Sequence, residues 1–206
     1  MARPAHPTRR EDILDAAREE FNARGFAGAR LDDIARKAGI SKAAIYLQFE
    51  SKEAIFRALV TEILEKMLPQ IAPSDPGEES AEKLIRQFIA MAFAQFTSRE
   101  LAFLPRMILG EGQNFPELAR FYHDHAILRV MAMIEAMIER GVTRGEFVCA
   151  MPQHACRSIV GGIVLAALWR IVLEPVGAAV LDVDSAAQVH ADMLLGGLLV
   201  RKEADQ

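Results

Sequence analysis

The sequence predicts an all-α protein, with an N-terminal three-helix helix-turn-helix domain followed by a helical bundle, about nine helices in total. Three observations predict this class. Apolar residues recur at helical spacing, and hydrophobic residues make up 51% of the 206 residues, enough for a large core. Capping residues and prolines stand where helices would begin, and glycines where they would end. No useful length of sequence alternates as a half-buried strand would.

The first predicted helix begins at a capping box. Thr8 is the expected N-cap, and Glu11 is placed to reach back to it. An apolar stripe follows at helical spacing, made of Ile13, Leu14, Ala17 and Phe21. Gly25 is expected to end this helix.

Residues 31–53 predict two short helices joined by a tight turn, then the start of a third. Gly39 is expected to stop the first helix in the left-handed conformation, and Ser41 and Ser51 to cap the next two. The residues expected to face inward are Leu31, Ile34, Ala35, Ala38, Ile40, Ala44, Ile45 and Phe49. A turn of about three to four residues is typical of the helix-turn-helix motif, whose second helix enters the major groove of DNA.

After a helix from Ser51, the stretch 69–79 is rich in proline, glycine, serine and acid, which predicts a linker. Further helices are expected at 80–97, 99–109, 116–140 and from Pro152 to before Pro175, with Gly141 ending the third of them. A last helix is expected from a cap at Asp184 or Ser185 to about Arg201. The predicted domains are residues 1–54, the helix-turn-helix domain, and residues 55–206, an effector-binding and dimerisation domain.

The net charge of −4 is unevenly distributed. Residues 1–60 carry 11 Lys and Arg against 9 Asp and Glu, so this part is +2 and the remainder −6. This suits a protein that presents one end to phosphate, although alone the asymmetry is weak evidence. Two cysteines without an N-terminal apolar segment favour a cytoplasmic protein with reduced thiols. The apolar stretch 159–173 is shorter than a membrane span and contains Arg170, so a buried or dimer-interface helix is expected.

Residues 8–60 resemble the TetR family of one-component transcriptional regulators. The resemblance is carried by Gly25-Phe26, Ile34-Ala35, Ala38-Gly39-Ile40-Ser41, Ile45-Tyr46, Phe49 and Ser51-Lys52-Glu53. The stretch 116–125, PELARFYHDH, is similar to the AefR-like subtype of C-terminal domain. The resemblance implies a homodimer that binds a near-palindromic operator, usually as a repressor, and that a small molecule in the C-terminal domain releases.

The resemblance also implies which residues contact DNA. They are Arg30, Lys42, Ala43, Ala44, Tyr46, Leu47, Gln48 and Lys52. The residue types agree, because Lys binds phosphate, Gln can read adenine, and Ala or Leu can touch a thymine methyl. Arg30 departs from the family, which usually has a hydroxyl residue at this position, and Arg cannot cap the helix. Tyr46 as half-buried support, the lysines as solvated charges, and Arg3, Arg9 and Arg10 as mere solubilising residues remain alternatives.

The C-terminal body is expected to dimerise and to hold an effector. The helices at about 152–173 and 184–201 are apolar nearly all round and contain paired glycines, which predicts a four-helix dimer interface. An apolar or aromatic effector is expected in a pocket lined by methionines and aromatics, with two polar handles, although such stripes are more often core. The candidate pocket residues are Phe88, Met91, Gln95, Met107, Phe121, His125 and Trp169.

Other functions have little support in the sequence. His123, His125, Cys149 and Cys156 do not match a zinc spacing, so no metal and no cofactor is expected. An all-helical enzyme lacks a nucleophile elbow, a phosphate loop or paired catalytic acids. An architectural DNA-binding protein without an effector remains the main alternative. The sequence leaves open the operator, the effector, the target genes, repression against activation, and the number of dimers per operator.

Overall fold

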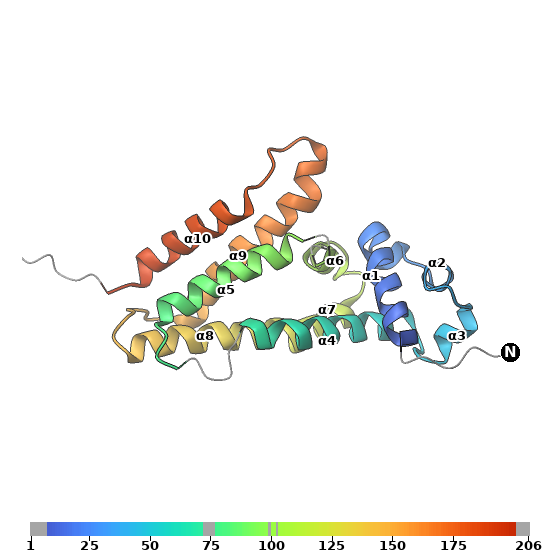
Figure 1. Cartoon of the computed structure of the whole chain (residues 1–206), viewed down its shortest axis with the longest axis horizontal. Helices are drawn as coiled ribbons and strands as arrows, with labels where there is room; N and C mark the ends of the chain where they lie inside the picture. Colours follow the sequence, from blue (N-terminus) through green and yellow to red (C-terminus); the bar gives the residue numbers. More distant parts are fainter. Residues whose placement is uncertain (1–7, 72–76, 99, 102, 201–206) are drawn as a thin grey trace, which may run out of the picture. The chain divides into compact units, whose positions relative to one another are not determined.

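A computed structural model describes residues 8–71, 77–98, 100–101 and 103–200, and these are almost entirely helical (Figure 1). The helices are α1 (Thr8–Gly28), α2 (Leu31–Lys37), α3 (Lys42–Tyr46), α4 (Lys52–Ile71), α5 (Ala81–Phe96), α6 (Phe103–Glu111), α7 (Pro116–Tyr122), η1 (His123–Ile127), α8 (Leu128–Thr143), α9 (Pro152–Leu168), η2 (Trp169–Leu173), η3 (Glu174–Val176) and α10 (Val183–Leu198). Since η1 joins α7 to α8, and η2 and η3 continue α9, the described residues form nine continuous helical segments. The all-α class is confirmed.

The chain divides into two compact units. The first, here called the head, comprises Met1–Glu65 and Arg106–Ala126, and the second, the body, comprises Lys66–Pro105 and Ile127–Gln206. The head therefore includes the end of α6 and all of α7, which lie far along the chain from the helix-turn-helix.

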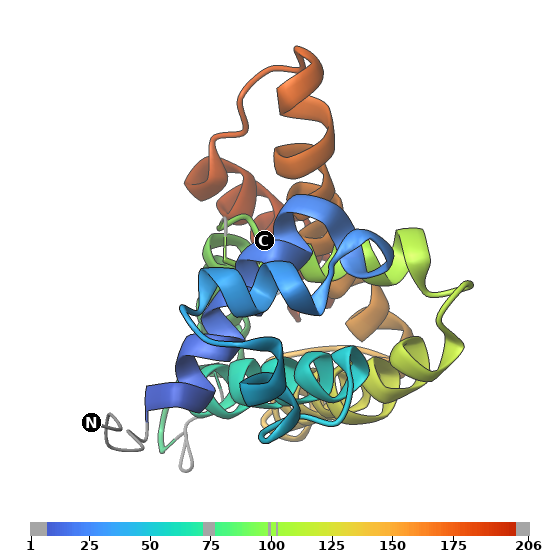
Figure 2. The same cartoon turned by 90° about the vertical axis from the view of Figure 1, so that its right-hand side faces the viewer.

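An aromatic cluster lies in the core of the head, whose N-terminal helices are drawn in blue and cyan in Figure 2. Phe21, Phe26 and Phe56 are fully buried, and the rings of Phe21 and Phe26 each meet Phe56 edge-on at centroid distances of 6.3 and 6.0 Å. Edge-on aromatic pairs add about 0.5–1.5 kcal/mol beyond the area that they bury. This cluster packs α1 against α4, and the two helices support the small helices α2 and α3.

A buried carboxylate ties α1 to α2. The side chain of Glu20 is only 2% exposed, and its oxygens lie 3.0 Å from Arg24 Nε and 3.2 Å from Lys37 Nζ. Removing one partner of a buried ion pair leaves an uncompensated charge, which is strongly destabilising. The contact therefore helps to hold α2 against α1.

The body is a bundle in which α5 packs against α8, α9 and α10, and α9 packs against α8 and α10 (Figure 1). Close approach of α9 and α10 occurs at Gly162, where a Cβ atom would overlap the ring of His190. That ring is 3.0 Å from the carbonyl oxygen of Ile159 through its Nε2. Gly162 therefore lets α9 and α10 approach closely within one chain, and the predicted dimer interface at the glycine pairs stays a prediction.

Four helix boundaries differ from the prediction, at the end of α4, at α6, at the end of α8 and at the start of α10. The predicted linker at 69–79 begins too early, because α4 continues to Ile71 and includes Pro69. A proline within the last helical turn removes a single backbone hydrogen bond, so the helix tolerates it there. The helix predicted at 99–109 is displaced to Phe103–Glu111.

Gly141 does not end its helix as predicted. The helix α8 continues to Thr143, and Gly145 takes the left-handed conformation at φ 71° just beyond it. Gly141 instead makes room for packing, because a Cβ there would overlap the buried ring of Phe147.

The cap of α10 is also earlier than predicted. Asp182, and neither Asp184 nor Ser185, is the N-cap: its Oδ1 accepts from Ser185 N at 3.2 Å and its Oδ2 from the Ser185 hydroxyl at 2.6 Å. The helix ends at Leu198, and the predicted end near Arg201 lies outside the described residues.

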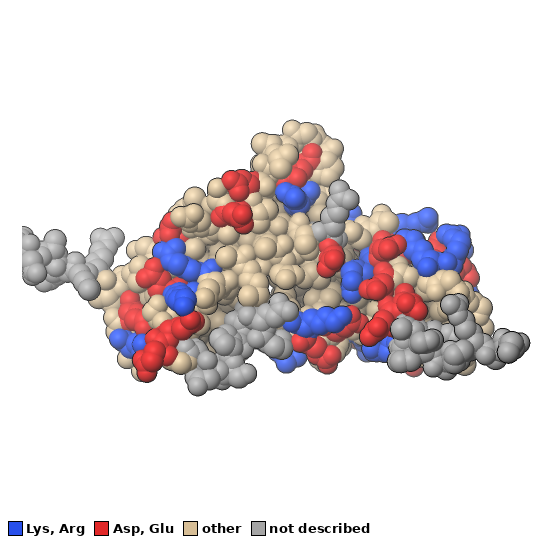
Figure 3. Space-filling view, viewed as in Figure 1, with Lys and Arg blue, Asp and Glu red and all other residues tan. Residues whose placement is uncertain are grey.

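Helices α9 and α10 leave apolar side chains uncovered within the single chain. The exposed members, here called the apolar face, are Leu165, Val172, Val176, Val189 and Met193. By length and composition alone, Pro152–Val176 could cross a membrane: an 18-residue window within it has a mean hydropathy of 1.9, and 22% of that window is buried, which is weak evidence for a span. In Figure 3 the surface over α10 and the loop before it is mainly tan, whereas blue and red patches alternate over α1 and α2.

Candidate nucleic-acid interface

The turn between α2 and α3 has the predicted construction. Gly39 is left-handed at φ 67°, and Ile40 N donates to the carbonyl of Ala35 at 3.0 Å. The Ser41 hydroxyl then accepts from Ala44 N at 3.2 Å and caps α3. Ser51 Oγ likewise accepts from Ala54 N at 3.1 Å at the start of α4. Short-range capping therefore sets both ends of the motif.

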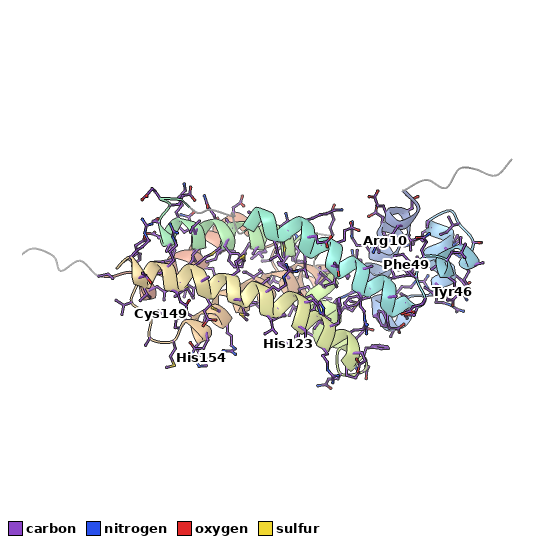
Figure 4. The ribbon with its side chains drawn as sticks, turned by 90° about the horizontal axis from the view of Figure 1, so that it is seen from below. Arg10, Tyr46, Phe49, His123, Cys149 and His154 are labelled. Atoms are coloured by element: carbon purple, nitrogen blue, oxygen red, sulfur yellow. The ribbon has the colours of Figure 1, made fainter. Side chains whose placement is uncertain are left out.

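The helix α3 has one buried side and one open side. Ile45 is fully buried and Phe49, just beyond the helix, is 6% exposed. Tyr46 is 51% exposed and Leu47 79% exposed, and Figure 4 shows Tyr46 at the outer end of this segment. The exposed residues, here called the recognition face, are Lys42, Ala43, Tyr46, Leu47 and Gln48. Ala44 is half-buried beside them.

Charged side chains surround the recognition face. Lys42 Nζ is 3.0 Å from Asp32 Oδ2 on α2, and both side chains are about half exposed. Arg36 forms an ion pair with Asp33 one turn along α2. An exposed ion pair contributes little free energy and exchanges readily, so Lys42 can leave Asp32 for a phosphate. Sequence reasoning did not single out Asp32.

Arg30 is the N-cap of α2 and makes no capping hydrogen bond with its side chain, as its residue type predicts. Its side chain is exposed and therefore available for other contacts. The guanidinium of Arg10, at the start of α1, lies 5.5 Å above the ring of Phe49 (Figure 4). Arg3 lies outside the described residues, and the side chain of Arg9 is not described.

Lys52 has a different environment from the other predicted DNA contacts. Its Nζ donates to the carbonyl oxygens of Phe26 at 2.6 Å and Ala29 at 2.9 Å, and that of Ala27 lies at 3.5 Å. It also lies 4.5 Å from the centroid of the Phe26 ring. Burial lowers the pKa of Lys52, while the nearby carboxylates of Glu53 and Glu111 act in the opposite direction. The ammonium group is thus bound to the end of α1.

Sequence reasoning also missed Glu111, the last residue of α6. Its two carboxylate oxygens accept from Phe26 N at 3.0 Å and Ala27 N at 2.6 Å. The separation of about 85 positions along the chain leaves no local pattern that would connect these residues. Only Gly25, which was expected to end α1, marks the place where the carboxylate approaches.

The predicted effector residues fall into two groups. Phe88, Met91, Gln95 and Trp169 belong to the body, and Met107, Phe121 and His125 to the head. Within the body, Phe88 is 3% exposed, while Met91 and Gln95 are half-buried on the same helix. The Trp169 indole N–H donates to the carbonyl of Ala179 at 2.8 Å.

In the head, the rings of Phe121 and His125 stack at a centroid distance of 4.2 Å. His125 is exposed, and its Nδ1 is 3.0 Å from the carbonyl oxygen of Phe121. The guanidinium of Arg57 lies 5.5 Å from the Phe121 ring. Met107 is buried at 3% exposure. These contacts make a small stacked cluster on the head.

The described part of the chain contains no assembled metal or redox site. No group of three or more His, Cys, Asp or Glu residues there is placed to hold a metal ion. Burial raises the pKa of the Cys156 thiol to about 11, so it is protonated at neutral pH and a poor nucleophile. Cys149 is also a free thiol.

A short capped helix with a polar exposed edge, supported by an aromatic core, defines the class: a helix-turn-helix DNA-binding protein. Two family models match the chain. Residues 13–59 match the model of bacterial regulatory proteins of the tetR family, and residues 82–195 match that of the AefR-like transcriptional repressor C-terminal domain.

Individual proteins show the same likeness. The regulator UidR of Escherichia coli strain K12 is 30% identical over 119 residues, which is 58% of this chain and 59% of UidR. The structure of Salmonella enterica GusR has a TM-score of 0.74 at 20% identity and covers 95% of this chain and 98% of GusR. The regulator FadR of Bacillus subtilis, in complex with stearoyl-CoA, has a TM-score of 0.72 at 20% identity, covering 91% of this chain and 98% of FadR.

The chain therefore belongs to the TetR family of transcriptional regulators, with an AefR-like C-terminal domain. The predicted function, a ligand-responsive DNA-binding regulator that is not an enzyme, is confirmed at the level of the family. The chain aligns with less than two thirds of the length of UidR. Its operator, effector and assembly must therefore be inferred from its own residues.

Proposed function

We propose that this protein is a repressor that binds a near-palindromic operator as a homodimer and leaves it on binding a small apolar or aromatic effector. The observation that carries the proposal is the recognition face. The five residues of this face, in α3 and the turn that follows it, are exposed, although Ile45 and Phe49 in the same segment are buried. The open side of this helix is exposed to solvent, and its polar side chains suit contacts in a DNA groove.

Each DNA-contacting residue has a role that follows from its chemistry. Lys42 and Arg30 supply charge for phosphate, and the Tyr46 hydroxyl supplies a phosphate hydrogen bond. Gln48 can pair with adenine, while Ala43, Ala44 and Leu47 can lie against thymine methyl groups. Lys52 stands outside this set because backbone carbonyls already bind its ammonium group.

The apolar face supports dimerisation through α9, η2, η3 and α10. Met193 is 75% exposed and Leu165 61% exposed, and a Cβ at Gly161, Gly196 or Gly197 would meet nothing within 4 Å. Contiguous exposed carbon of this kind is typical of an interface. Two recognition helices of one dimer would contact half-sites about 34–36 Å apart. Because its target is chromosomal DNA, the protein would act in the cytoplasm.

The effector class rests on this chain's own side chains, since the likeness to stearoyl-CoA-bound FadR extends to the fold alone. Met91 and Gln95 are half-buried on α5 beside Phe88, and Trp169 is half-buried on η2. Methionine and aromatic side chains adapt to apolar ligands, and one amide can orient such a ligand. Coupling between effector and operator is typically 1–3 kcal/mol in free energy.

The DNA-binding proposal is tested by selecting duplexes from a random-sequence library with the full chain, followed by fluorescence anisotropy on the selected duplex. We expect a two-fold symmetric selected sequence that binds at least ~1,000-fold more tightly than random duplex, as specific sites do at physiological salt. Gln48→Ala should relax preference at one base pair in each half-site, costing about 1–3 kcal/mol there. Gln113→Ala, an exposed residue of the same type after α6, is the control. Failure to enrich any sequence would refute the proposal.

The effector proposal is tested by thermal unfolding of the full chain with a panel of fatty acyl and aromatic compounds. A binding compound should raise the midpoint and release the selected duplex. Met91→Glu should abolish the shift, while Met151→Glu, an exposed methionine just before α9, should not. Release by purely polar compounds alone would contradict the proposed class.

A further inference from the structure

Two oppositely charged side chains form hydrogen bonds with the backbone at the end of α1. The carboxylate of Glu111 accepts from the amides of Phe26 and Ala27, at 3.0 and 2.6 Å. The ammonium group of Lys52 donates to the carbonyls of Phe26 and Ala29, at 2.6 and 2.9 Å. The backbone of residues 26–29 is therefore held by charge-assisted hydrogen bonds on its donors and on its acceptors, which are stronger than neutral ones.

The chain is shaped to admit the carboxylate. Gly25 has φ 71° and ψ −178°, so the helix breaks there and the amides of the next two residues point away from it. A Cβ at Gly25 would overlap Glu111 Oε1, so a larger residue, already strained at this positive φ, would displace the carboxylate from the two amides. Phe115, four residues after Glu111, meets the Phe26 ring edge-on at 4.9 Å. The same short segment thus contacts both the backbone and the side chain of Phe26.

The hydrogen bonds of Lys52 leave no donor for DNA. An ammonium group has three N–H donors, and three carbonyl oxygens lie within 3.5 Å of Nζ. Lys42 differs, because it has a single carboxylate partner and is about half exposed. Phosphate binding by Lys52 would have to displace at least one of these carbonyl oxygens, of which that of Ala27 is the most distant.

The backbone of residues 26–29 leads directly into the helix-turn-helix motif. Ala29 precedes Arg30, whose carbonyl accepts the first helical hydrogen bonds of α2 from Asp33 N and Ile34 N, each at 3.1 Å. Because α2 in turn supports α3, a shift of this turn would displace the recognition face. A displacement of about 1 Å is enough to weaken a hydrogen-bonded contact strongly.

We infer that Glu111 and Lys52 are positioning residues for operator binding, and that Lys52 does not contact phosphate. The inference rests on the proposed DNA binding. It extends the DNA-binding unit beyond residues 13–59 to the end of α6, in agreement with the head that the fold defines.

The test compares full-chain variants on the duplex selected by the wild type. Glu111→Gln keeps the shape of the side chain but loses its charge, and Glu111→Ala removes both acceptors. Lys52→Met removes the ammonium group, and Lys42→Met removes the proposed phosphate contact. The matched controls are Glu117→Gln, an exposed acid of α7 paired only within its helix, and Lys83→Met on α5. Thermal unfolding shows which variants remain folded.

Glu111→Gln should weaken binding about tenfold, and Glu111→Ala more, as expected when charge-assisted hydrogen bonds are removed. Lys52→Met should weaken binding while the slope of log affinity against log salt stays at the wild-type value. Lys42→Met should reduce that slope by about 0.9 for each phosphate that the variant no longer neutralises. Amide hydrogen exchange of residues 26–27 should accelerate in Glu111→Gln, which reports on the carboxylate's hydrogen bonds without DNA.

Three outcomes would overturn the inference. A slope reduced by about 0.9 for each of the two Lys52 side chains of the dimer would mean that Lys52 neutralises a phosphate. Unchanged affinity and exchange in Glu111→Gln would show that its hydrogen bonds position nothing. If the wild type selects no duplex, the proposed function itself fails, and accelerated exchange at residues 26–27 would then mark a purely structural contact.

Discussion

The head and the body both bury an apolar core, but they leave different chemistry at their surfaces. On the head, the recognition face presents an amine, a phenol and an amide beside the apolar side chains of Ala43 and Leu47. On the body, the apolar face presents large apolar side chains, among them Leu165, Val189 and Met193. Donors directed at solvent suit phosphate and base edges, whereas exposed carbon suits another protein surface.

This contrast shows how one chain can separate two kinds of binding. The polar contacts of the recognition face are individually exchangeable, as the exposed Lys42–Asp32 pair illustrates. The apolar face gains free energy in proportion to the area that it buries, which favours a permanent partner. We therefore expect substitutions on the body to change assembly, and substitutions on the head to change affinity and sequence preference.

The largest expected effect comes from breaking the apolar face. The double variant Leu165→Asp, Met193→Asp would place charges in the proposed dimer interface and should give a monomer in sedimentation equilibrium. Affinity for the selected duplex should fall at least ~100-fold, because two linked half-site contacts become one. Leu128→Asp places the same charge at another exposed apolar residue, on α8, and should leave the oligomeric state and the affinity for the duplex unaltered. A dimeric double variant would place the interface elsewhere.

The next effect concerns charge on the recognition face. Asp32→Asn removes the carboxylate 3.0 Å from Lys42 Nζ and should tighten binding to all duplexes. The expected gain is a few-fold, comparable to the ~0.2–1 kcal/mol of an exposed ion pair. Titrations with selected and random duplex should show equal gains. Asp12→Asn on α1 is a control, and a gain confined to the selected sequence would imply base recognition by Asp32.

Arg30 allows the two roles of one residue to be separated. Arg30→Thr should supply the missing cap of α2 and raise the free energy of unfolding by about 1 kcal/mol. The same variant should bind DNA less tightly, because it has no guanidinium for the phosphate. Urea unfolding and anisotropy give the two quantities, and Arg30→Ala should bind less tightly without the gain in stability. Tighter binding by the Thr variant would show that α2 order matters more than the charge.

The smallest effect is a pH dependence at the cap of α10. Hydrogen bonds from the Ser185 hydroxyl and amide hold the pKa of Asp182 below its usual value of 3.8. Because the folded-state pKa is the lower one, the stabilisation is present above pH 3.8 and is lost as the pH falls through the folded pKa. The stability difference between wild type and Asp182→Ala should therefore be constant near neutrality and shrink in acid. A difference that grows in acid would contradict the assignment.

Much of the recognition motif could be predicted because it depends on local chemistry. Gly39, Ser41 and Ser51 act on residues within four positions, and all three behave as expected. Helix ends governed by distant packing were predicted less well. Gly141 was expected to end a helix but instead accommodates the ring of Phe147. The cap of α10 was misplaced for a local reason, because Asp182, Asp184 and Ser185 are all capping residue types and the hydrogen bonds to Ser185 select Asp182.

The candidate site divides in the same way. That Tyr46 and Gln48 would be exposed while Ile45 would be buried follows from helical periodicity. The environment of Lys52 does not, because its partners lie 23–26 positions away in the chain. Glu111 gave no signal, since a carboxylate at the end of a helix is common and its amide partners belong to another helix.

By itself, the sequence determined the helical class, the family and the helix-turn-helix with its capped recognition helix, because periodicity and capping act over a single turn. Only the tertiary structure decided that residues 106–126 belong with the head, and that the end of α1 lies between Lys52 and Glu111. Those contacts arise from packing between distant segments, which depends on the three-dimensional path of the whole chain.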